Sequence, residues 1–124
     1  MLMYVLAGVT VAAAGTSGKE LYQRDCARCH GDDGKGAAPS MRAVPGYVSV
    51  DLTLLSNENG GRFPRQEVQD AIEGSTRFPA HLIGGMPLWG RIYAPGPNPA
   101  AKDQQQAREK IAVLTDYIES LQSK

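Results

Sequence analysis

The sequence predicts an all-α protein, and two observations support that prediction. No stretch of the 124 residues shows the alternation of apolar and polar residues that marks a β-strand. The C-terminal segment, in contrast, carries apolar residues at helical spacing, which predicts an amphipathic helix that begins near Asp103 and docks its apolar side on the rest of the chain. This apolar stripe consists of Ala107, Ile111, Leu114, Tyr117, Ile118 and Leu121.

Capping signals predict helices in the first half of the chain. Ser17 with Glu20 three residues later has the form of a capping box, so a helix is expected to begin at Gly18 and to run towards the two cysteines. Asp51 is suited to cap one or two helical turns.

One more helix is predicted between two long irregular segments. Pro64 is suited to the first position of a helix and Gly74 to a C-terminal stop, so a helix is expected between them. Residues 31–61 are expected to be mostly turns and residues 74–101 irregular, with the proline-rich run 95–99 excluding regular structure locally.

Composition limits the size of the core and the class of partner. With 42% hydrophobic residues the chain has enough apolar material for one modest core, so a single domain is expected. Thirteen basic residues balance thirteen acidic ones, so the chain lacks the net positive charge expected of a nucleic-acid binder. A small chain with 14 glycines and 8 prolines usually needs something other than side chains to fill its centre.

The N-terminal residues differ from the rest. Residues 2–15 are almost continuously apolar or small and include Ala12-Ala13-Ala14, as in a secretory leader with its cleavage site. The segment is shorter than the roughly 20 residues of a spanning helix. We therefore expect a leader or its remnant at 1–15 and one domain at 16–124, with a retained anchor or an ordinary N-terminal helix as the alternatives.

The main chemical signal is the string Cys26-Ala27-Arg28-Cys29-His30. It has the C-x-x-C-H pattern of c-type haem attachment. Two thiols three residues apart can reach the two vinyl groups of a haem, and the adjacent imidazole can bind its iron. The motif predicts one covalent haem c held through Cys26 and Cys29, with His30 as an axial ligand.

Three rival interpretations are weaker. A redox-active dithiol is expected beside a βαβ pattern, which is absent from the sequence. A structural zinc site needs four ligands, and the chain offers only Cys26, Cys29, His30 and a distant His81 from the usual set. A disulfide between the two cysteines would close a very short loop and would leave His30 unexplained.

With this motif the chain resembles the class I monohaem bacterial cytochromes c, over residues 18–121. Gly18 and Tyr22 are similar to contact residues of the family's N-terminal helix, and Leu114 and Tyr117 are similar to their partners on the C-terminal helix. The resemblance implies the cytochrome c fold, in which four or five short helices surround one covalent haem and the terminal helices pack together.

The second axial ligand is also implied by the resemblance. Met86 lies in Met86-Pro87-Leu88-Trp89-Gly90, which is similar to the Met-Pro-x-Trp-Gly pattern of many bacterial members. The family then implies Met86 as the sixth iron ligand. His81 is the competitor, because bis-His ligation is also known and normally gives a lower potential.

Four further residues are candidates for contacts with the haem. The resemblance implies that the Pro39 carbonyl accepts a hydrogen bond from His30, which would orient the imidazole. Arg42, Tyr47 and Trp89 are candidates for binding the propionates, because buried carboxylates need donors or positive charge.

These expectations favour an electron carrier over an enzyme. With His30 and Met86 both on the iron, no coordination position stays open for a substrate. We expect a bacterial periplasmic protein that shuttles single electrons between respiratory partners such as a dehydrogenase, a cytochrome complex, or a terminal oxidase or reductase. A haem-bearing subunit of a larger oxidoreductase is the alternative, and a haem sensor or peroxidase is a third hypothesis.

Overall fold

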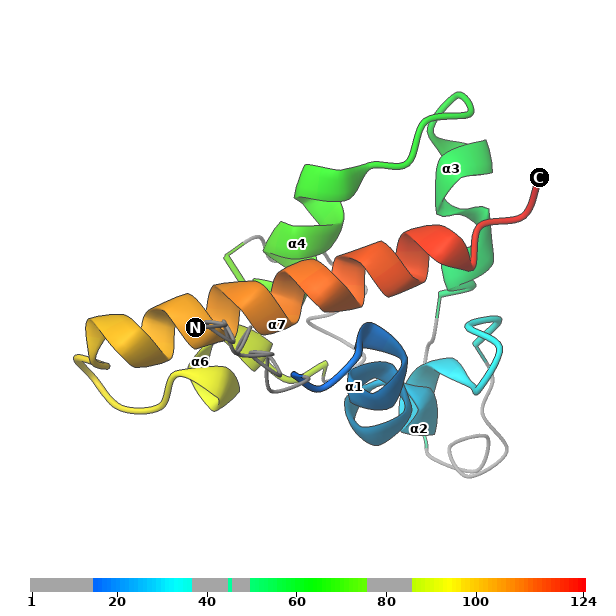
Figure 1. The fold of residues 1–124 in the computed structure, drawn as a ribbon. Coiled ribbons are helices and arrows are strands. Elements are labelled where there is room, and N and C mark those ends of the chain that lie inside the picture. Colours follow the sequence, from blue (N-terminus) through cyan, green and yellow to red (C-terminus); the bar gives the residue numbers. More distant parts are fainter. Residues whose placement is uncertain (1–14, 37–44, 46–49, 76–85) are drawn as a thin grey trace, which may run out of the picture.

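The computed structural model describes residues 15–36, 45, 50–75 and 86–124. Within these residues the chain forms helices and no strand, so the all-α prediction is confirmed (Figure 1). The helices in chain order are α1 (Gly18–Asp25), α2 (Ala27–His30), the short 3-10 helix η2 (Leu52–Leu54), α3 (Leu55–Glu58), α4 (Arg65–Glu73), α6 (Trp89–Tyr93) and α7 (Ala101–Ser120).

Helix α1 begins where the capping box predicted. The Ser17 hydroxyl accepts a hydrogen bond from the Glu20 backbone N–H at 3.2 Å, and Glu20 Oε2 accepts one from the Ser17 N–H at 2.8 Å. Two N–H groups at the start of the helix are satisfied in this way. Cys26 ends α1 and directly precedes α2, so the two helices meet at the first cysteine of the motif.

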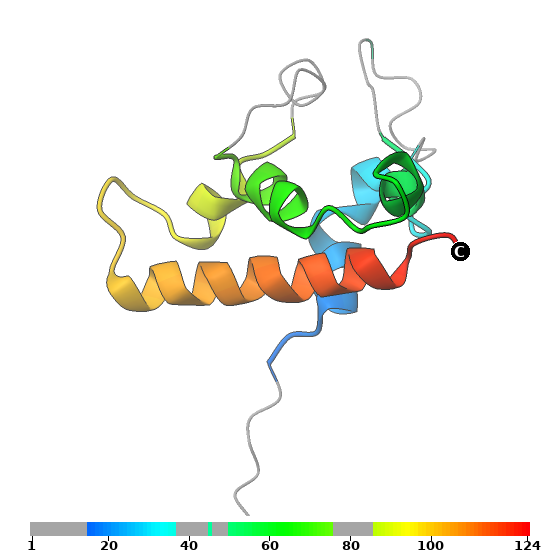
Figure 2. The same ribbon diagram turned by 90° about the horizontal axis from the view of Figure 1, so that it is seen from above.

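Helix α7 is the longest element, and α1, α4 and α6 pack against it. Figure 2 shows α4 and α6 along one side of α7, with α1 crossing the helix. Ala107, Ile111, Leu114 and Ile118 of the predicted stripe are buried, and Tyr117 and Leu121 pack against the core at its border.

The crossing of α1 over α7 depends on Gly18. A Cβ added to Gly18 would lie 2.2 Å from the Val113 carbonyl oxygen and 3.0 Å from the Tyr117 Cβ, so only glycine allows this approach. One helical turn later, the rings of Tyr22 and Tyr117 lie with their centroids 5.2 Å apart. The predicted contact of the terminal helices is thereby confirmed.

Ion pairs and hydrogen bonds connect η2, α3 and the start of α4 to the C-terminal end of α7. Arg65, the first residue of α4, forms ion pairs with Asp116 and Glu119 of α7. Gln122 accepts a hydrogen bond from the Ser56 N–H at 2.9 Å and donates one to the Leu52 carbonyl at 2.6 Å. These contacts place η2 and α3 beside the C-terminal end of α7.

Helix α6 was not predicted, because residues 74–101 were expected to be irregular. The helix has five residues and includes a glycine, so local propensity is weak and packing against α4 and α7 must stabilise it.

Two other helices begin at slightly different residues from those predicted. Pro64 is the N-cap of α4 instead of its first residue, and α7 begins at Ala101 instead of near Asp103.

Within the described residues, no helix combines the length and the apolar character needed to cross a membrane. The predicted leader, residues 1–15, lies almost entirely outside the described ranges, and the division at residue 15 stays a prediction.

Candidate functional site

The C-x-x-C-H residues lie on a single helical turn. The Cys26 N–H donates to the Tyr22 carbonyl of α1 at 2.8 Å, and the His30 N–H donates to the Cys26 carbonyl at 2.9 Å. Backbone hydrogen bonds thus connect the motif to α1 and join its first and last residues. Its position relative to α7 follows from the α1–α7 crossing described above.

A cavity of about 270 Å³ lies beside this turn, and Cys26, His30 and Met86 all contribute to its lining. Met86 is far from the motif in sequence, so tertiary structure brings Cys26, His30 and Met86 to one cavity. Among the described residues, the rest of the wall is mostly apolar, with Glu67 as its charged residue. It is formed by Val50, Leu52, Leu55, Pro64, Glu67, Val68, Ala71, Ile72 and Ile118.

The Cys26 thiol lies in an apolar environment. The residue is 6% exposed, and burial, helped by the nearby charges of Asp25 and Cys29, raises the pKa of the thiol to about 12. A thiolate is therefore disfavoured at this position. A thioether, which carries no charge, matches these surroundings.

The backbone after His30 is supported by a hydrogen bond that the sequence did not reveal. The buried Tyr22 hydroxyl donates to the Gly31 carbonyl at 2.7 Å, and burial raises the pKa of this phenol. The family pattern suggested Tyr22 only as a helix contact. Its second role depends on the turn that follows α2, for which the sequence carries no separate signal.

Two predicted site residues lie elsewhere on the described structure. Cys29 is half-buried and is not part of the cavity wall formed by the described residues. Trp89 packs at the border of the core, with its ring centroid 5.5 Å from that of Tyr93. The propionate contact expected of Trp89 stays a prediction.

The other predicted site residues are outside the described ranges. They are Pro39, Arg42, Tyr47 and His81. Their expected roles as hydrogen-bond partner, propionate ligands and competing iron ligand stay predictions.

The rival zinc and dithiol interpretations find no support in the described residues. Three or more His, Cys, Asp or Glu side chains do not converge anywhere in this part of the chain, and that includes Cys26, Cys29 and His30. No βαβ unit accompanies the cysteines there either.

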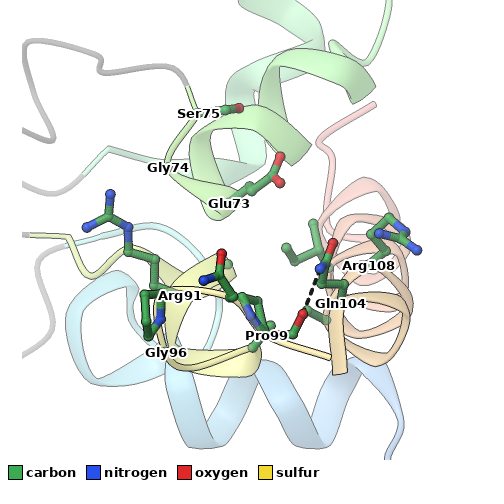
Figure 3. A pocket seen from close by; sticks show the side chains of 14 residues that line it. Glu73, Gly74, Ser75, Arg91, Gly96, Pro99, Gln104 and Arg108 are labelled. Carbon is green, nitrogen blue, oxygen red and sulfur yellow. Dashed lines mark hydrogen bonds between the residues drawn. The ribbon is translucent and has the colours of Figure 1, made fainter. Parts of the chain in front are cut away.

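A second hollow, of about 540 Å³, lies between the end of α4, helix α6, the proline-rich segment and the first half of α7 (Figure 3). Its wall is mixed, with charged residues such as Glu73 and Arg91. Gln104 donates a hydrogen bond to the Pro99 carbonyl within it at 2.8 Å. Neither the C-x-x-C-H residues nor Met86 line this hollow. The donor groups, and not the larger volume, therefore mark the candidate haem site.

The smaller cavity fits a covalently bound haem c. Its apolar wall suits a porphyrin, Cys26 offers a thiol for attachment, and His30 and Met86 offer the imidazole and thioether that bind iron in cytochromes c. Asp25, which directly precedes Cys26, accepts a hydrogen bond from the Tyr93 hydroxyl, and sequence analysis singled out neither residue.

Comparison with known proteins agrees with this chemistry. The cytochrome c family model matches residues 16–122. No curated protein and no solved structure matches the chain. The family match covers most of the chain and includes the single C-x-x-C-H motif, which accounts for one covalent haem c. The chain therefore belongs to the cytochrome c family, whose members perform haem-based electron transfer with redox protein partners.

Proposed function

We propose that the protein is a one-electron carrier whose haem is attached through Cys26 and Cys29, with His30 and Met86 as axial iron ligands. The observation that carries this proposal is the presence of Met86 on the wall of the cavity that also contains Cys26 and His30. Bound haem c supplies a centre that is oxidised and reduced by one electron.

Whether the protein acts as an electron carrier or as a catalyst depends on the two axial ligands of the haem iron. If an imidazole and a thioether from the chain occupy both axial positions, a substrate or oxygen has no place to bind. The apolar wall and the thioether ligand both favour the reduced state, in which the iron carries less positive charge. We expect a positive midpoint potential, and a value well below zero in a redox titration would contradict this ligand set.

The absorption spectrum of the oxidised protein tests Met86. Sulfur bound to ferric haem gives a charge-transfer band near the red end of the visible spectrum. We expect this band in the wild type and in His81→Ala, and its loss in Met86→Ala. Absence of the band from the wild type, with Met86→Ala leaving the spectrum unchanged, would instead support His81 as the ligand, and carbon monoxide binding to the reduced wild type at neutral pH would support an open or labile sixth position.

We also propose that the protein works outside the cytoplasm, in the bacterial periplasm. The apolar residues before the domain support this location, since they are typical of a secretory leader. The partners in this proposal are a dehydrogenase or cytochrome complex on one side and a terminal oxidase or reductase on the other. N-terminal sequencing of the purified protein tests the leader, and an intact Met1 would argue against cleavage.

A permanent place in a larger oxidoreductase is the second candidate function. Leu88 and Ile92, which lie close after Met86 in the chain, are 36% and 52% exposed, and apolar residues at this position suit a stable interface. Co-purification with a catalytic chain at high salt would favour the subunit. A transient complex that weakens with ionic strength would favour the free carrier.

A further inference from the structure

We propose that Asp25 and Tyr93 form a latch that holds residues 86–93, the Met86 segment, against α1, the helix that ends directly before Cys26. The latch is the hydrogen bond in which the Tyr93 hydroxyl donates to Asp25 Oδ2 at 2.6 Å. This inference rests on the proposed function, because it takes Met86 as an iron ligand. Asp25 and Tyr93 are then positioning residues, which act on the iron through Met86.

The Met86 segment needs such support because the helix that follows it is very short. Helix α6 begins three residues after Met86 and has five residues. A single helical turn does not persist alone in water. The position of α6, and with it the position of Met86, must come from contacts with other elements.

Contacts from α6 reach three neighbouring helices. Gly90 lies against the end of α4, so that a Cβ added to Gly90 would lie 2.8 Å from the Glu73 carbonyl oxygen. The Lys110 ammonium of α7 lies 5.1 Å from the centroid of the Tyr93 ring. The third contact is the latch to Asp25, the last residue of α1 and the direct neighbour of Cys26. Of these three contacts, the latch is the one that joins α6 to the helix next to the attachment motif.

The acceptor of the latch is itself held in place. Arg24 Nε and Nη2 donate to Asp25 Oδ1 and Oδ2, both at 2.8 Å, so the carboxylate has a defined orientation and keeps its charge. The Asp25 side chain is 10% exposed and Tyr93 is 9% exposed. Because water has little access, the hydrogen bond to the charged oxygen is strong compared with one at the surface.

The expected effect of the latch is on the equilibrium between attached and detached Met86. A molecule in which Met86 has left the iron offers a position for an external ligand such as imidazole. Breaking the latch loosens α6 and raises the fraction of such molecules, and this raises the apparent affinity for imidazole by the same factor.

Imidazole binding to the oxidised holoprotein tests the latch. Tyr93→Phe removes the donor and Asp25→Ala removes the acceptor. We expect each variant to keep the sulfur–iron band without imidazole and to bind imidazole about tenfold more tightly, as lost hydrogen bonds to charged groups imply. The double variant should bind imidazole about as tightly as either single variant, because both changes remove the same interaction.

Asp116→Ala is the matched control. It deletes a carboxylate of α7 whose ion pair is with Arg65 of α4. We expect it to lower the thermal unfolding midpoint with imidazole affinity unchanged.

The outcomes separate the latch from the ligand assignment. If the wild type shows the band but the latch variants bind imidazole like the wild type, or no more tightly than Asp116→Ala, the latch is wrong and Met86 ligation stands. If the band is absent from the wild type and Met86→Ala leaves the spectrum unchanged, the ligand assignment is wrong, and the latch is overturned with it.

Discussion

At the scale of single residues, burial and hydrogen bonding decide which groups carry charge beside the attachment motif. Cys26 lies in apolar surroundings that favour its neutral form, and its pKa rises to about 12. The preceding residue, Asp25, shows the opposite effect. Its hydrogen bonds with Arg24 and Tyr93 hold the pKa of the carboxyl below its ordinary value, although partial burial acts in the other direction. Before haem attachment, a neutral thiol and an ionised carboxylate thus stand side by side.

Asp25 should make stability depend on pH in the acid range. Because its pKa is lower in the folded chain than the unperturbed value of 3.8, its contribution is fully present above that value and is lost as the pH falls through the folded pKa. Lys110, close to the Tyr93 ring, acts in the same direction as Arg24.

Denaturant unfolding of the wild type and Asp25→Asn from neutral to acid pH measures this contribution. We expect the wild type to be more stable at neutral pH by a constant difference that shrinks below 3.8. A difference that persists unchanged to the lowest pH would show that the charge of Asp25 is not its source.

At the scale of elements, the crossing of α1 and α7 fixes where the attachment motif lies. Helix α1 ends at Asp25, directly before Cys26, and Gly18 at its other end lies against the backbone of Val113. The two helices therefore approach at the distance that a missing Cβ allows. Any change that separates them also moves the motif away from the cavity wall contributed by Ile118 of α7.

Gly18→Ala should destabilise the protein through this crossing. Alanine has the higher helix propensity, but its Cβ would lie 2.2 Å from the Val113 carbonyl oxygen, so the helices must shift. We expect a loss of roughly 1–3 kcal/mol in the free energy of unfolding, as for other overpacked sites. Gly15→Ala is the control because nothing lies within 4 Å of its added Cβ. Equal effects of the two substitutions would contradict a close-packed crossing.

At the scale of the whole molecule, the core is incomplete without a cofactor. The buried side chains gather around α7, and the cavity of about 270 Å³ lies beside them. The described wall of this cavity is mostly apolar, so a porphyrin that fills it removes apolar side-chain surface from water. The haem is therefore part of the core.

Blocking haem attachment should weaken the whole fold. We expect the double variant Cys26→Ala/Cys29→Ala, produced without bound haem, to lose the near-ultraviolet circular dichroism that reports fixed packing of aromatic rings, and to retain part of its helical signal. Unfolding of the holoprotein should remain cooperative. A haem-free variant with a sharp thermal transition at the midpoint of the holoprotein would contradict this role of the haem.

Much of the fold and the attachment chemistry follows from local sequence patterns. The capping box of Ser17 and Glu20 predicted the start of α1, and the apolar stripe predicted the buried side of α7, because both signals lie within one helix. The C-x-x-C-H string identified the haem chemistry because the thiols and imidazole act within one helical turn. The family and its one covalent haem were predicted from this same motif.

The sequence alone determined that this chain is helical, that its C-terminal helix is amphipathic and that it binds haem through Cys26 and Cys29. Tertiary structure decided the rest. It placed Met86 on the cavity of Cys26 and His30, formed α6 where no local signal predicts it, and joined Tyr93 to Asp25. The physical reason is distance along the chain. Periodicity and capping report interactions between residues a few positions apart, whereas the position of a five-residue helix depends on packing against partners from three other helices.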